Sequence, residues 1–169
     1  DSLVWLISNR FGNVSCDASF IAQSLSVDYG IFSATSLLSP KNRISEISFF
    51  QSEIKVDTLV NAIIHSENSI LEIGFIESGV IKSEFSTWMI ANANELSINT
   101  ETDNFEIKHA RDLTIKGMYS DCSVNLIREK LETELVYGKF MLGGIAPEFK
   151  TVNINHNNVF TNLNIVDTT

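Results

Sequence analysis

The feature that most constrains the fold of this chain is a repeat of 17 residues. In consecutive blocks from residue 60 the chain reads VNAIIHSENSILEIGFI, ESGVIKSEFSTWMIANA, NELSINTETDNFEIKHA and RDLTIKGMYSDCSVNLI, without a gap over residues 60–127. Four columns are apolar in every block: Ile64, Ile81, Ile98 and Ile115 (fifth); Leu71, Trp88, Phe105 and Cys122 (twelfth); Ile73, Ile90, Ile107 and Val124 (fourteenth); Ile76, Ala93, Ala110 and Ile127 (seventeenth). A strict period is expected where each residue lies above its equivalent one turn earlier, so the pattern predicts stacked parallel coils.

The local pattern within each block is that of short strands. Apolar residues in columns three and five, and in columns twelve and fourteen, lie two positions apart, whereas an amphipathic helix needs spacings of three and four. The polar stretches between them are typical of turns. A left-handed β-helix would repeat every six residues with three equal sides. The uneven spacing of these columns favours a right-handed single-stranded parallel β-helix, an all-β solenoid.

The same columns continue beyond the regular blocks. Upstream and downstream positions that fit them are Ile7, Val14, Cys16, Val27, Phe32, Ala34, Leu37, Ile47, Ile54, Val56, Leu59, Leu131, Phe140, Leu142 and Ile145. We predict about nine coils, a rod on the order of 43 Å long at ~4.8 Å per coil. They form one domain over residues 1–169, with regular coils in 43–145 and looser terminal coils in 1–42 and 146–169.

Charge and hydropathy restrict the partners. Lysine and arginine total 12 against 21 aspartates and glutamates, a net charge of −9, which argues against nucleic acid or an anionic membrane as partner. No apolar stretch approaches the roughly 20 residues that span a bilayer. The chain begins at Asp1 without a charged leader and apolar segment, so we expect a soluble, mature or trimmed product. No cofactor is expected.

Residues 131–165, LETELVYGKFMLGGIAPEFKTVNINHNNVFTNLNI, resemble exported bacterial adhesin-like β-helix proteins of the auto-transporter adhesin head type. These families repeat an aromatic, then Gly or Ser, then a polar and an apolar residue. The repeats here are Phe11-Gly12-Asn13-Val14, Tyr29-Gly30-Ile31-Phe32 (with Ile31 at the polar position), Tyr119-Ser120-Asp121-Cys122 and Tyr137-Gly138-Lys139-Phe140. The resemblance implies a right-handed β-helix, a removed leader, and a place in the periplasm or on the cell surface. It implies no catalytic residues. Because Gln51, Asn68 and Thr102 fill the aromatic column in other coils, the motif is interpreted as structural.

No group of residues predicts catalysis. His65, His109 and His156 lie on different coils and in different columns, so we expect three surface histidines and no shared site. Pectin-degrading β-helix enzymes work through aspartates and bound calcium on one face, and here Asp103 and Asp121 lie on adjacent coils in adjacent columns, near Asp112. They are interpreted as turn residues.

The acidic column is a more specific candidate for binding. Glu67, Glu84 and Glu101 occupy the eighth column of consecutive blocks, where a parallel stack places like charges about 5 Å apart. A bridging calcium ion is one interpretation, and a solvated acidic edge is the one we favour, so no metal site is assigned. Lys82 and Lys116 in the sixth column would relieve part of the repulsion.

The two cysteines, Cys16 and Cys122, fall in inward columns of the first and seventh coils. Six coil steps separate them by about 29 Å, far beyond the ~7 Å Cα limit of a disulfide. We therefore predict two free thiols.

The two ends differ in polarity. Leu3-Val4-Trp5-Leu6-Ile7 is strongly apolar, so we expect it to be covered by further chain or another molecule, or to form an end-to-end homodimer. The last coil, Ala146 to Ile165, interleaves asparagines with apolar residues and is expected to act as a cap.

Three functions remain open after these observations. A binding module for an unknown glycan or protein ranks first, because it requires only the exposed face of a rod. A structural element that assembles through the apolar first coil ranks second. A carbohydrate-active enzyme ranks third, and it would require a groove lined by three or more carboxylates on neighbouring coils.

Overall fold

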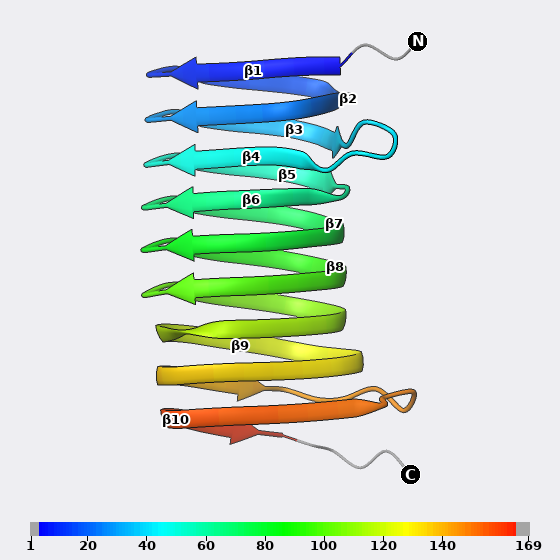
Figure 1. The fold of residues 1–169 in the computed structure, drawn as a ribbon, viewed down its shortest axis with the longest axis vertical. Helices are drawn as coiled ribbons and strands as arrows, with labels where there is room; N and C mark the ends of the chain where they lie inside the picture. The colour runs from blue at the N-terminus through cyan, green and yellow to red at the C-terminus, as the bar shows by residue number, and fades with distance from the viewer. Residues whose placement is uncertain (1–3, 165–169) are drawn as a thin grey trace.

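The computed structural model describes residues 4–164 and shows a stack of parallel β-coils (Figure 1). The chain is all-β, 83% strand, with about nine coils of ~17 residues and no helix in the described part. The strands are β1 (Val4–Arg10), β2 (Asn13–Asp28), β3 (Ile31–Leu38), β4 (Ser45–Phe50), β5 (Glu53–Leu59), β6 (Ala62–Glu67), β7 (Ile70–Glu84), β8 (Thr87–Glu101), β9 (Asn104–Leu142) and β10 (Thr151–Leu163).

Each coil has a front and a back strand. β4 and β6 pair in parallel on the front, β3 and β5 pair in parallel on the back, and the longer β7, β8 and β9 bend around from one side to the other. In Figure 1 the nearer strands run from right to left and the farther ones return from left to right as the chain descends, which is a right-handed coil. The solenoid, and the handedness that the spacing favoured, are therefore as predicted.

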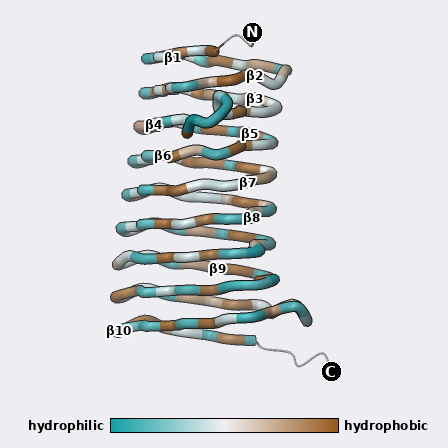
Figure 2. The backbone as a smooth tube through the Cα atoms, turned by 45° about the vertical axis from the view of Figure 1, so that its right-hand side comes forward, coloured by the Kyte–Doolittle hydropathy of each residue, from teal (hydrophilic) through white to brown (hydrophobic). Residues whose placement is uncertain are grey.

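The register between coils is the 17-residue period of the sequence. Ile64 pairs with Ile81, and Ile81 with Ile98, so the fifth column is one continuous row of side chains. Every residue of the four apolar columns is buried. In Figure 2 apolar and polar residues alternate along most strands, the pattern expected when one side of each strand faces the interior.

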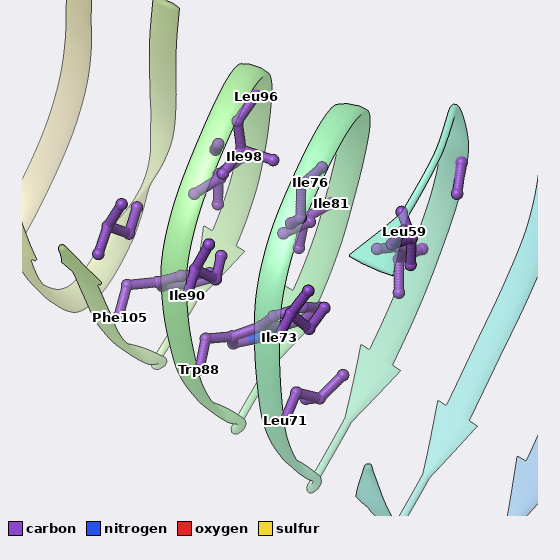
Figure 3. Close-up of a cluster of buried hydrophobic side chains, with 14 of the residues drawn as sticks. Leu59, Leu71, Ile73, Ile76, Ile81, Trp88, Ile90, Leu96, Ile98 and Phe105 are labelled. Atoms are coloured by element: carbon purple, nitrogen blue, oxygen red, sulfur yellow. The ribbon is translucent and has the colours of Figure 1, made fainter. Parts of the chain in front are cut away.

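The core is a set of side-chain ladders that run along the rod. In Figure 3 Leu71 and Ile73, Trp88 and Ile90, and Phe105 project from successive coils into one interior. The rings of Trp88 and Phe105 stack with centroids 5.6 Å apart and planes 10° apart. The looser terminal coils continue the ladders with partly buried residues, among them Ile7, Val14, Cys16 and Ile154. Leu3 and Ile165, which the terminal-coil predictions include, lie outside the described residues.

Candidate functional site

One corner of the rod has the same unusual backbone in every coil. The ninth-column residue there has a positive φ, so we call this row the αL corner: Phe11, Tyr29, Gln51, Asn68, Phe85, Thr102, Tyr119, Tyr137 and Asn158, with φ between 46° and 58°. It follows the front strands, at the left edge of Figure 1. The fold needs this conformation to reverse the chain within about two residues.

The αL conformation is unfavourable for the aromatic residues that fill the corner in more than half of the coils. Asn and Gly tolerate positive φ well, whereas bulky side chains rarely adopt it and are destabilised there by about 1–2 kcal/mol. The aromatic side chains are also exposed, by 69% at Phe11 and 55% at Phe85 and Tyr119. Because Gln51, Asn68 and Thr102 form the same turn, the fold does not require aromatic residues at this corner.

The aromatic residues fall into two stacked pairs and one single ring. Phe11 and Tyr29 stack with centroids 4.9 Å apart, and Tyr119 and Tyr137 stack at 5.1 Å. Phe85 lies between them along the corner, with the shorter Asn68 and Thr102 at the same position of the adjacent coils. In the part of the chain that the structure describes, its ring therefore has no aromatic neighbour along the corner.

The predicted acidic column lies directly beside the αL corner. Glu67 pairs in register with Glu84, and Glu84 with Glu101, so the three glutamates follow one another along the rod. All three are exposed, and within residues 4–164 none of them forms an ion pair. Of the two lysines expected to relieve their repulsion, Lys116 pairs instead with Glu134, at 3.0 Å.

The three glutamates line an open groove of about 520 Å³ on the front face. It is lined by Ser48, Phe49, Phe50, His65, Ser66, Glu67, Lys82, Ser83, Glu84, Asn99, Thr100 and Glu101. The groove thus has three carboxylates on neighbouring coils, the feature that a carbohydrate-active enzyme would require. In the described part of the chain no group of three or more His, Cys, Asp or Glu side chains is placed to hold a metal ion.

Behind the corner lies a polar ladder that the sequence analysis missed. It consists of the tenth-column residues Ser52, Ser69, Ser86, Asp103 and Ser120, all of them buried. The backbone N–H of Ser52 donates to Ser69 Oγ and that of Ser69 to Ser86 Oγ, each at 3.1 Å, and each serine hydroxyl donates to the carbonyl two residues earlier. The ladder satisfies backbone groups that the sharp corner would leave without a partner.

Asp103 is the one charged member of this ladder. Its carboxylate accepts hydrogen bonds from the hydroxyls of Ser83 and Thr100 and from the backbone N–H groups of Ser86 and Glu101. Only 4% of the residue is exposed, and burial raises the pKa of the Asp103 carboxyl above 3.8 although these hydrogen bonds act to lower it.

The three aspartates that the sequence analysis interprets as turn residues lie in different surroundings. Asp103 is buried, Asp121 is exposed, and the Asp112 carboxylate pairs with Arg111 at 3.0 Å. Asp112 lies in register with Glu95, at the opposite end of the front strand from the αL corner. Asp103 lies in the turn between β8 and β9, as the sequence predicts, but its side chain is buried among the inward serine positions of the other coils.

Replacing Asp103 with Ser should relieve a pH-dependent destabilisation. The folded pKa lies above the unfolded one, so the stability linked to this carboxyl is greatest below about pH 3.8 and is lost as pH rises through the folded pKa. The stability of Asp103→Ser relative to the native chain should therefore increase between pH 3 and pH 7 in urea unfolding. Asp103→Ala, which leaves four donors without their acceptor, should be destabilised by about 1–3 kcal/mol. A Ser variant whose relative stability does not change with pH would contradict this role.

The histidines are not all at the surface. His65 and His109 are exposed as predicted, but His156 is half-buried, and its ring meets Phe140 edge-on with centroids 5.3 Å apart. Burial lowers the pKa of His156, and its ring nitrogens contact the hydroxyls of Thr133 and Thr161. The expectation of a surface residue is wrong here because His156 pairs in register with buried Leu135 and so faces inward.

The cysteines are free thiols, as predicted. Cys122 is buried, and burial, followed by the nearby charges of Asp103 and Asp121, raises its thiol pKa to about 12. A thiol with so high a pKa is almost wholly protonated at neutral pH and is a poor nucleophile. Cys16 is half-buried in the first coil.

Comparisons with protein-family models, curated proteins and solved structures find no match. No helix among the described residues is long and apolar enough to cross a membrane.

Proposed function

We propose that this protein is a non-enzymatic, adhesin-like binding module that holds a glycan along the αL corner and the adjoining groove. The observation that carries the proposal is the exposed aromatic side chain at a backbone position that favours asparagine, best represented by Phe85. Residues that lower stability without serving the fold are commonly retained for function. The resemblance to exported adhesin-like proteins supports an extracytoplasmic location, in the periplasm or on the cell surface.

The chemistry of the corner suits a neutral or amino sugar. Aromatic rings give apolar surface to the C–H faces of sugar rings, and amide, hydroxyl and carboxylate groups hydrogen-bond their hydroxyls. Phe85 has all of these beside it, in Asn68, Thr102, Glu84 and Glu101. The net charge of −9 disfavours polyanionic ligands, and the groove runs along the rod across successive coils, as a linear chain requires.

A glycan array probed with the purified chain tests the proposal. We expect binding to neutral or amino-sugar oligosaccharides, and at least tenfold weaker binding by the double variant Glu84→Gln/Phe85→Asn. The matched control is Met89→Gln, which replaces an exposed apolar residue on the back of the rod and should bind normally. Absence of glycan binding, or equal binding by the double variant, would contradict the proposed site.

The same samples test the non-enzymatic part of the proposal. The glutamates of the groove are open to solvent, whereas the general acid of a glycoside hydrolase typically lies in an apolar pocket. Bound oligosaccharides should therefore be recovered at their original length. Shortened products that disappear in Glu84→Gln would instead identify the acidic column as catalytic.

A second candidate function is a structural or assembly role. It is favoured by the exposed apolar residues of the first coil, Val4 and Trp5, and by Leu6, which is 73% exposed.

A further inference from the structure

Among the described residues, the first and last coils each have an outer side that pairs with no other strand. Within residues 4–164, β1 pairs only with β2, and β10 pairs only with β9. Each terminal strand therefore has one unpaired row of backbone N–H and carbonyl groups. In β-proteins such edges readily pair with another chain unless the sequence prevents it.

The terminal strands lack the residues that normally protect an edge. β10 contains no Asp, Glu, Lys, Arg or Pro, and β1 contains a single charge, Arg10, at its last position. Charged side chains and proline are the usual means of blocking edge-to-edge association. The chain as a whole is 20% charged, so a 13-residue edge strand without charge is unusual for this sequence.

The inward positions of the two terminal coils match one another. The αL residue, Phe11 in the first coil and Asn158 in the last, gives a common reference point. Counted from it, the aligned inward pairs are Trp5 with Val152, Ile7 with Ile154, Asn9 with His156, Val14 with Thr161 and Cys16 with Leu163. If the first coil of one copy stacks on the last coil of another in this register, each apolar residue contacts an apolar residue or the methyl group of Thr161. Asn9 and His156 form the one polar pair.

The last coil also has an opening that the first coil would cover. An apolar hollow of about 150 Å³ at the C-terminal end is lined by Leu142, Ile145, Phe149, Val152, Ile154 and Leu163. Trp5 aligns with Val152 at the edge of this hollow, and 48% of its surface is exposed. Its large indole would bury apolar surface on both copies in such a stack.

We infer that this chain assembles head to tail, the first coil of one copy stacking on the last coil of the next. This arrangement continues the parallel pairing and the column register that already join successive coils within the chain. A two-fold dimer through the first coil would make the paired strands antiparallel and put different columns opposite each other. Because a head-to-tail contact does not close, the product is a linear assembly of rods.

Sedimentation velocity on the purified 169-residue chain tests the inference. We expect species whose mass increases with protein concentration. Trp5→Lys blocks the first coil and Val152→Lys blocks the last, both at exposed positions. Each variant alone should be monomeric, whereas an equimolar mixture should form a dimer, because each then supplies the end that the other lacks. Met89→Lys, which adds the same charge to the body of the rod, should assemble like the native chain.

Three results would overturn this inference. A native chain that stays monomeric at all concentrations would exclude self-assembly. If Trp5→Lys is monomeric and Val152→Lys is dimeric, the contact is two-fold and runs through the first coil. If each variant assembles on its own, neither end of the rod is the interface. These outcomes are independent of glycan binding, because both variants leave the αL corner intact, and circular dichroism verifies their fold.

Discussion

Inserting one alanine between Ser97 and Ile98 in β8 should abolish cooperative folding of the central coils. Side chains alternate between the two sides of a strand, so the insertion turns Ile98 and Thr100 outward and Asn99 inward. Ile98 is fully buried, and each buried aliphatic side chain moved into water loses ~1.5–3 kcal/mol. Every ladder through the coil is interrupted, so we expect loss of the sigmoidal thermal transition seen by circular dichroism.

The matched control is the same insertion in the loop between β3 and β4, after Lys41. This loop projects from the rod in Figure 1, and its residues lie outside the coil-to-coil register. The chain also accommodates an extra residue elsewhere, since Tyr119 and Tyr137 stack although they are 18 positions apart. The control should melt within a few degrees of the native chain. Equal stability of the two insertions would contradict a core built from register-locked columns.

Replacing Ile107 with Ala should lower the free energy of unfolding by about 2–5 kcal/mol. Ile107 is fully buried in β9 and in register with Ile90, so truncation leaves a cavity that rigid neighbouring coils cannot close. Urea unfolding measures the loss. Glu106→Ala, at an exposed position next to it, should change the free energy by less than about 0.5 kcal/mol. A loss at Ile107 no larger than that of the control would show that this column is not core.

The coil stack could be predicted from the sequence because a parallel solenoid converts sequence period directly into spatial contact. Residues that share a column of the repeat in residues 60–127 pair in register on adjacent coils, as Ile64, Ile81 and Ile98 do. The same logic correctly placed Glu67, Glu84 and Glu101 side by side. Their groove could not be predicted, because the sequence period does not give the shape of the space between these side chains and others that line it, such as Phe50 and Lys82.

The buried polar ladder also recurs with the period of the coils, but the sequence analysis does not predict it. Ser52, Ser69, Ser86 and Ser120 recur with the coils, in polar stretches that the sequence predicts to be turns. Hydropathy alone does not distinguish a serine that faces water from one that satisfies buried backbone groups. The buried position of Asp103 follows from its place in this column.

The sequence predicts a structural role for the aromatic motif, whereas the proposed function assigns its exposed residues to binding. The aromatic residues of the motif have a positive φ and exposed side chains. Neither property can be predicted from the spacing of residues in the sequence. Within the stacked pairs some aromatic residues contribute to packing, as with Tyr119 and Tyr137. Phe85 has no stacked aromatic partner among the described residues. Replacing it therefore distinguishes a role of the motif in binding from a role in folding.

The central claim, that the corner residues serve binding and not the fold, is tested most directly by urea unfolding of the Glu84→Gln/Phe85→Asn chain. Asparagine accepts positive φ more readily than phenylalanine, and glutamine removes one charge from a row of three. We therefore predict a free energy of unfolding equal to or higher than that of the native chain. A decrease of more than about 1 kcal/mol would show that Phe85 and Glu84 stabilise the coil stack, and would contradict the account.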